Sequence, residues 1–232
     1  NIAGVLPADT AGKSLAAYDA RLSATDAAAL ESSHTGGHRA RALGFDGQVY
    51  ATANFPGISG NSPRTVAFWV KVPEGAKTDA WMVSWGTHVK KLSSRPVQIS
   101  WNRRPGEGPF GALRTDFGGG YAIGTHDLRD GRWHHVAVFF AAGDDASTPV
   151  QVKQYIDGQL QSSAVTLTPG KTSSSPLTGD AARQDLVWLG CRLTGKQPER
   201  FRGALDELFI VDRSLEPQEI ISIAREDDQV VL

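Results

Sequence analysis

Short runs of alternating apolar and polar residues, separated by Asp-Gly pairs, are the feature that most constrains the fold of this chain. Residues 64–72 (RTVAFWVKV) place Val66, Phe68 and Val70 on one face, as a half-buried strand does. Further β-rich runs occupy residues 97–102, 133–140, 150–156, 185–189 and 205–211. The Asp-Gly pairs at 46–47, 130–131 and 157–158 supply the left-handed conformations that tight reversals need. The pattern predicts an all-β, antiparallel fold.

A helix is expected only near the end of the chain. Glu216 fits the capping position, Pro217 fits the first turn, and Leu215 can pack against Ile220. The Ala-rich residues 10–33 have helical propensity, but their apolar spacing is irregular. No segment of 20 to 50 residues repeats and no linker divides the 232 residues, so we expect a single domain spanning residues 1–232.

The composition excludes two classes of partner. The chain has 24 basic and 25 acidic side chains, for a net charge of -1, so no overall field favours nucleic acid. The longest apolar run, residues 136–142, is far shorter than the roughly 20 residues that cross a bilayer. The chain begins at Asn1, and we therefore expect a processed protein or a piece of a longer one. We expect no nucleic acid partner and no membrane insertion, and the oligomeric state stays open.

Five blocks of residues occur in a recognisable order: 43–47 (LGFDG), 65–70 (TVAFWV), 130–137 (DGRWHHVA), 155–158 (YIDG) and 201–208 (FRGALDEL), the last continued by 212–215 (DRSL). In this order they resemble the LamG-like (laminin-G type 3) jelly-roll domains, over residues 14–225. The resemblance implies a two-sheet antiparallel jelly-roll sandwich of the concanavalin A-like lectin/glucanase type, with a short C-terminal helix. Members of the family serve in adhesion, glycan binding and spacing, so the fold alone leaves the function open.

Signatures of catalysis are missing from the sequence. The paired acids of laminarinase-type enzymes do not occur, and residues 106–111 match Gly-x-Gly-x-x-Gly without a helix to follow, which predicts a turn rather than a phosphate site. We therefore expect no enzyme. A divergent glycoside hydrolase or lyase that uses Asp116 or Asp127 stays open, and it would need two carboxylates within about 10 Å of each other.

Three residues with reactive side chains have structural interpretations. Cys191 lies in an apolar setting and has no partner for an internal disulfide, which indicates a buried, inert thiol. His134 and His135 are adjacent on an expected strand, so one faces the core and the other the surface. We predict that both are hydrogen-bonded structural residues.

Two groups of residues are candidates for ligand contact. Five basic residues without an acid, Lys90, Lys91, Arg95, Arg103 and Arg104, are interleaved with Trp85 and Trp101. Such a patch suits sulfates, carboxylates or an acidic partner, although a solvated rim with the tryptophans in the core would give the same pattern. Polar residues that alternate with core positions are expected to line a concave sheet face. The predicted ligand-binding set is Gln98, Ser100, Asn102, Arg103, Arg104, Lys153 and Tyr155.

A structural Ca²⁺ site is predicted at Asp46 and Asp206. The resemblance places residues 43–47 beside residues 203–208, and this would bring the two carboxylates into one neighbourhood. Calcium needs six to eight oxygen ligands, which carboxylates and backbone carbonyls supply. The alternative is that Asp46 bonds to its own turn and that Asp206 satisfies a strand end.

These observations favour a non-catalytic binding or adhesion module of a larger exported or envelope protein, located outside the cell or in the periplasm. Its expected partner is a glycan or a protein surface. A purely structural spacer and the divergent hydrolase or lyase are the alternatives.

Overall fold

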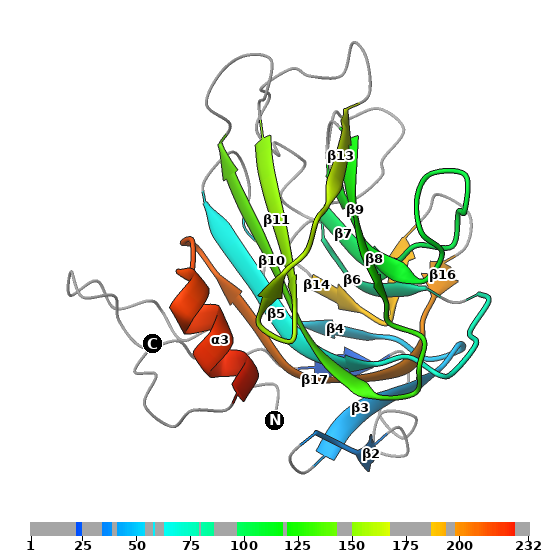
Figure 1. The fold of residues 1–232 in the computed structure, drawn as a ribbon. Coiled ribbons are helices and arrows are strands. Elements are labelled where there is room, and N and C mark those ends of the chain that lie inside the picture. Colours follow the sequence, from blue (N-terminus) through cyan, green and yellow to red (C-terminus); the bar gives the residue numbers. More distant parts are fainter. Residues whose placement is uncertain are drawn as a thin grey trace, which may run out of the picture.

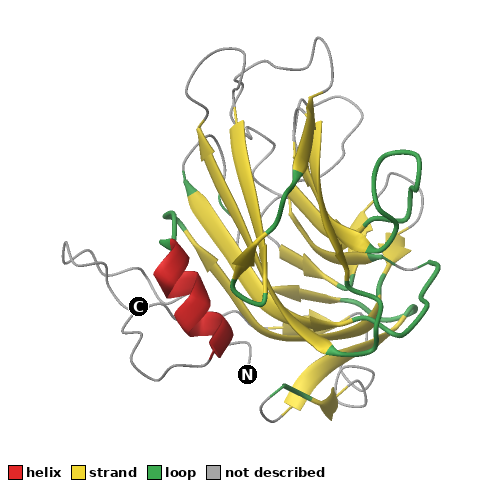
Figure 2. Ribbon diagram, in the orientation of Figure 1, coloured by secondary structure: helices red, strands yellow, loops and turns green. Residues whose placement is uncertain are grey.

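The computed structural model describes residues 22–24, 34–38, 41–53, 58, 63–78, 80–85, 97–117, 120–142, 150–167, 187–193 and 198–225. Within this part of the chain, all strand pairs are antiparallel and form two large curled sheets and one small ribbon (Figure 1). Nearly all the remaining regular structure is one C-terminal helix, drawn in red in Figure 2. The expected jelly-roll sandwich is confirmed.

The eight-stranded sheet contains, in spatial order, β1 (Leu22–Ala24), β4 (Ala51–Ala53), β14 (Val187–Leu189), β6 (Trp81–Trp85), β7 (Val97–Trp101), β8 (Ala112–Phe117), β9 (Gly120–Asp127) and β13 (Ala164–Leu167). The seven-stranded sheet contains β12 (Gln159–Leu160), β11 (Val150–Ile156), β10 (Trp133–Ala142), β5 (Arg64–Lys71), β17 (Arg202–Val211), β3 (Arg41–Asp46) and β2 (His34–Gly36). The ribbon pairs β15 (Cys191–Leu193) with β16 (Pro198–Arg200).

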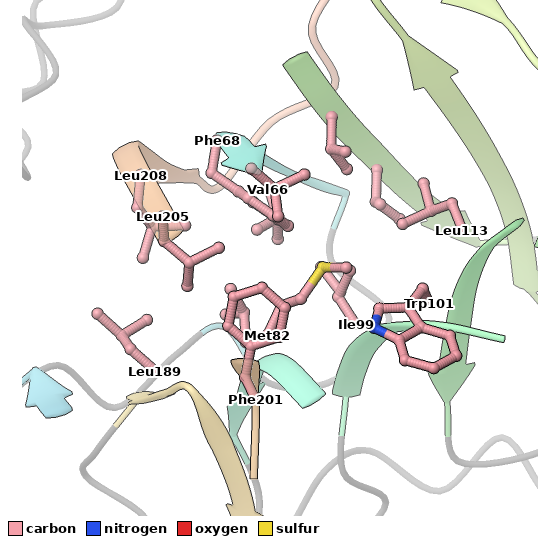
Figure 3. Packing of buried hydrophobic residues seen from close by; sticks show 14 of the residues in the cluster. Val66, Phe68, Met82, Ile99, Trp101, Leu113, Leu189, Phe201, Leu205 and Leu208 are labelled. Carbon is pink, nitrogen blue, oxygen red and sulfur yellow. The ribbon is translucent and has the colours of Figure 1, made fainter. Parts of the chain in front are cut away.

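The core lies between the two sheets and is built from alternate residues of each strand. In β5, Val66, Phe68 and Val70 point inward and are buried, as the two-residue period predicts. Val66 and Phe68 face residues of the opposite sheet such as Met82 and Ile99 (Figure 3). Each large apolar side chain buried in this way stabilises the fold by about 1.5–3 kcal/mol.

One polar residue crosses the core. Gln154 of β11 is fully buried, and its amide nitrogen donates to the hydroxyl of Thr115 on β8 at 2.9 Å. Its amide oxygen accepts a hydrogen bond from Ser163 at 2.7 Å. Because both ends of the amide have partners, the residue links the two sheets without leaving a polar group unsatisfied.

Helix α3 (Pro217–Arg225) covers part of the outer face of the seven-stranded sheet. Ala67 and Ala137 are paired directly on this face, and their small side chains let the helix approach. Leu215 and Ile220 pack on them. The carboxylate of Glu219 accepts the backbone N–H of residue 216 at 2.7 Å, so the helix begins where the capping signals predicted.

The turns also follow the sequence. Asp157 and Gly158 have φ angles of 51° and 76° and form the two-residue loop between β11 and β12, as Asp-Gly predicts. Residues 106–111 form turns rather than a phosphate loop. The helical propensity of residues 10–33 is not realised at Leu22–Ala24, which form strand β1, because pairing with β4 overrides propensity.

Candidate ligand-binding face

The structure divides the predicted ligand-binding residues between the two outer faces of the sandwich. Gln98 and Ser100 alternate with core residues of β7 and lie on the outer face of the eight-stranded sheet. Lys153 and Tyr155 lie on the outer face of the opposite sheet, where Tyr155 is buried beneath α3. The expectation that all four line one concave face is corrected, because β11 belongs to the other sheet.

Asn102 is also not available to a ligand. Its side chain is fully buried, and its amide nitrogen donates to the backbone carbonyls of Gly108 and Pro109 at 2.9 and 3.0 Å. Its amide oxygen accepts the N–H of Arg104 at 3.0 Å. Asn102 therefore stabilises the conformation of the loop of residues 102–111, and its polar atoms are already used within the protein.

The outer face of the eight-stranded sheet has a polar centre flanked by aromatic residues. The strand registers place Trp188, Ser84, Gln98, Asp116 and Tyr121 in one row across β14, β6, β7, β8 and β9. Gln98 is only 3% exposed, and Ser100, in the adjacent row, is 1% exposed. Trp188 and Tyr121 are half-buried. The centre of the face is thus covered, whereas its two flanks present aromatic rings.

Charged side chains cover the centre. We call them the charged belt, which consists of Arg103, Arg104, Glu107, Arg114, Asp116, Arg192 and Glu199. At one end, the Glu199 carboxylate accepts hydrogen bonds from Arg192 at 2.9 and 3.1 Å and from Arg103 at 2.6 Å. Arg192 also donates to Gln98 at 3.2 Å and lies 3.8 Å from the centre of the Trp81 ring. Arg192 therefore covers Gln98, which was expected to contact sugar hydroxyls.

The other end of the charged belt is built around Arg114. Its guanidinium donates to both carboxylate oxygens of Asp116 at 2.8 Å and also binds Glu107. Arg104 pairs with Glu107 at 3.0 Å. The Arg114 guanidinium lies 4.2 Å from the centre of the Tyr121 ring, so the belt reaches the aromatic flank.

The carboxylates of this face are arranged for charge pairing rather than for proton donation. Glu107 and Asp116 both bind the Arg114 guanidinium, so the two carboxylates are as close to each other as those of a hydrolase must be. A general acid needs a raised pKa. Burial raises the pKa of Glu107, but hydrogen bonds from Arg114 and Arg104 outweigh burial, so the pKa is lowered overall. The pKa of Asp127 is likewise lowered overall, because its bonds with Arg129 outweigh burial.

The basic stretch of the sequence is largely neutralised where the structure describes it. Arg103 and Arg104 are each paired with a glutamate. Trp85 and Trp101 lie in the core, as the solvated-rim alternative anticipates. The other three basic residues, Lys90, Lys91 and Arg95, lie outside the described residues.

Asp46, the first predicted calcium ligand, caps its own turn. One carboxylate oxygen accepts the backbone N–H groups of Gln48 and Val49 at 2.8 and 3.1 Å. The hydrogen bond from Gln48, followed by that from Val49, lowers the pKa of this exposed carboxyl. This arrangement is the Asp-turn alternative described above.

Asp206, the second predicted ligand, is not close to Asp46. Asp46 pairs with Arg202, and Asp206 lies four residues further along β17, which is about 13 Å at strand spacing. Asp206 is buried and accepts the backbone N–H groups of His38 and Glu207, both at 3.0 Å. In the described ranges, no group of three or more His, Cys, Asp or Glu side chains is placed to hold a metal ion.

The adjacent histidines have opposite environments. The two ring nitrogens of His134 contact carboxylates of Asp157 at 2.8 Å and Asp130 at 3.1 Å, and the bond to Asp157 raises the His134 pKa most. His135 lies on the outer face, is fully buried, and has no hydrogen-bond partner at either ring nitrogen. Burial lowers its pKa to about 4. The predicted hydrogen-bonded role holds for the side chain of His134 and is wrong for that of His135.

A family model described as the concanavalin A-like lectin/glucanases superfamily (laminin G type 3) matches residues 45–221. The chain belongs to this superfamily. No curated protein sequence matches it. The match covers most strands of both sheets, from the end of β3 onward, and the first half of α3.

Solved structures share this fold at low sequence identity. Domain 4 of the extracellular GH43 arabinanase AbnA from Geobacillus stearothermophilus, in complex with arabinotriose, is 20% identical, with a TM-score of 0.55 over 82% of this chain and 80% of that chain. A heptameric SAP-like pentraxin from Limulus polyphemus is 14% identical (TM-score 0.53; 78% and 80% covered). Domains LG4-5 of the mouse laminin alpha1 chain are 13% identical (TM-score 0.51; 79% and 45% covered). Among the residues that the structure describes, no helix is long and apolar enough to cross a membrane.

Proposed function

We propose that this superfamily member is a non-catalytic module that binds glycans through the outer face of its eight-stranded sheet. The observation that carries the proposal is the row in which half-buried Trp188 and Tyr121 flank the charged belt. Aromatic rings suit the apolar faces of sugars, and planar charged groups suit their hydroxyls. The likeness to an arabinanase domain in complex with arabinotriose supports this choice of ligand.

The size of the row favours an oligosaccharide. Trp188 on β14 and Tyr121 on β9 are four strand positions apart, which is about 19 Å at the usual spacing between strands. Only a ligand of several sugar units reaches both rings. We infer an extracellular or envelope location for this activity, where such ligands are exposed.

A glycan array followed by titration calorimetry on any positive glycan tests the proposal. Trp188→Ala and Tyr121→Ala should each weaken binding about twofold to tenfold, because an aromatic contact contributes roughly 0.5–1.5 kcal/mol. Trp133→Ala is the matched control, since Trp133 is a half-buried tryptophan on the opposite sheet. An array without any binding, or equal losses in all three variants, would contradict the proposal.

A purely structural spacer is the second candidate. The observation that favours it is the burial of Gln98 and Ser100, with the protein's own Arg192 donating a hydrogen bond to Gln98. A spacer predicts a folded protein that binds no glycan on the array. It also predicts that Trp188→Ala affects only stability.

A further inference from the structure

Arg200 forms a separate cluster at the Trp188 end of the row. Its guanidinium carbon lies 4.7 Å from the centre of the Tyr50 ring. Tyr50 in turn packs against Trp188, with 5.3 Å between ring centroids and 39° between ring planes. All three residues are half-buried. We call Tyr50, Trp188 and Arg200 the Arg200 cluster.

Arg200 differs in charge pairing from the arginines of the charged belt. Those arginines all bind carboxylates: Arg103, Arg104, Arg114 and Arg192. In contrast, Nη1 of Arg200 is buried and has no hydrogen-bond partner, and within the described ranges no carboxylate forms an ion pair with this residue. A buried donor without an acceptor costs about 1–3 kcal/mol, so proteins normally supply one.

The alternation of the ribbon explains why Arg200 has no acidic neighbour. Glu199 precedes it on β16, and successive side chains of a strand point to opposite faces. Glu199 pairs across the ribbon with Arg192, whereas Arg200 pairs with Cys191, whose side chain is apolar and buried. The described acid closest to Arg200 along the chain is therefore directed to the other side of the ribbon and is occupied there.

We propose that Arg200 binds the acidic group of a sugar whose ring packs on Trp188 and Tyr50. This inference rests on the proposed glycan-binding function and specifies its ligand as an acidic glycan. A guanidinium donates two parallel hydrogen bonds to a carboxylate or a sulfate through Nε and one Nη, and on Arg200 the edge available for this is Nε with Nη2, because Nη1 is buried. The anionic subsite is consequently at Arg200 rather than at Arg103 and Arg104, whose charges are already compensated by glutamates.

Titration calorimetry with matched probes tests this subsite. The probes are tetragalacturonate, its methyl ester, a sulfated galactan oligosaccharide and the corresponding neutral oligosaccharide. Wild type should bind one of the acidic probes at least about tenfold more tightly than its neutral counterpart. Arg200→Gln should weaken that acidic probe about tenfold to hundredfold, leave the neutral probe unchanged and reduce the salt dependence.

Two further variants control for charge and folding. Arg132→Gln removes the same charge from a side chain that is 83% exposed and should leave binding unchanged. Arg200→Lys keeps the charge but cannot donate two parallel hydrogen bonds, so it should bind the acidic probe with intermediate affinity. It replaces Arg200→Gln if that variant fails to fold. The carboxylated and sulfated probes show which acidic group is preferred.

The outcomes separate the subsite from the general function. Equal affinity for acidic and neutral probes, unchanged by Arg200→Gln, refutes the acidic subsite and leaves glycan binding intact. Equal losses in Arg200→Gln and Arg132→Gln also refute it, because the effect would then be general charge attraction. Absence of binding to every probe and array glycan overturns both proposals.

Discussion

Replacing His135 with phenylalanine tests how a buried imidazole sets the acid sensitivity of this fold. His135 is 0% exposed, and its two ring nitrogens have no partners. Its ring packs edge to face on Trp69, at 5.4 Å between centroids. Phenylalanine can keep this ring contact, and the substitution breaks no side-chain hydrogen bond. It removes only the proton-binding site and the buried polar atoms.

The sign and size of the effect follow from linkage. Burial lowers the pKa of His135 from 6.5 to about 4, so the unfolded chain binds a proton more readily than the folded one. Stability is therefore lost as pH falls through the window from 6.5 to 4. This lowering of the His135 pKa corresponds to about 3 kcal/mol of stability lost below pH 4, of which about 2 kcal/mol is already lost at pH 5.

Urea unfolding of both proteins at pH 7 and pH 5 measures the difference. The wild type should lose about 2 kcal/mol more than His135→Phe between the two pH values. His134→Gln is an informative control, because Asp157, above all, raises the His134 pKa. Protonated His134 stabilises the fold below pH 6.5, and this contribution is lost as the pH rises through the folded-state pKa of His134. The His134→Gln variant should therefore lose more stability than the wild type between pH 7 and pH 5. Equal losses in wild type and His135→Phe would refute the reasoning.

Two further substitutions test the loop and the predicted calcium site. Gly111 has a φ of 89°, and an added Cβ would lie 2.0 Å from Oδ1 of Asp127, so Gly111→Ala should lower the unfolding free energy by about 1–3 kcal/mol. Gly106→Ala, where nothing lies within 4 Å, is its control, and equal melting temperatures would contradict the prediction. Asp206→Ala should lower stability by about 1–3 kcal/mol through the loss of two backbone partners, equally in calcium and in chelator. A calcium-dependent melting temperature that this substitution abolishes would instead support the calcium site.

Local sequence was sufficient for several elements of the fold, whereas strands such as β6, β8 and β9 were not predicted from it. The alternation of Val66, Phe68 and Val70 defines which face of β5 enters the core, because a strand turns its side chains to opposite sides. The Asp157-Gly158 loop and the start of α3 at Pro217 depend on neighbours within four residues. Such features can be predicted from one sequence because their physical causes lie within the segment itself.

The candidate site was harder to predict, because its contacts join distant segments. Gln98 alternates as an outward polar residue should, yet Arg192, 94 positions away, covers it. Tyr155 shows the same outward pattern, yet α3 buries it. No local pattern shows which segment will lie over a strand.

The sequence by itself determined an antiparallel all-β chain with Asp-Gly turns and a C-terminal helix, since these follow from side-chain periodicity and backbone preferences. The two-sheet jelly-roll arrangement was implied by the resemblance to LamG-like domains. Only the tertiary structure decided which charges are compensated. Arg103 binds Glu199, 96 residues away, whereas Arg200, next to that glutamate in the chain, faces away from it. Charge pairing depends on distances of a few ångströms in space, and folding brings together residues that the sequence keeps far apart.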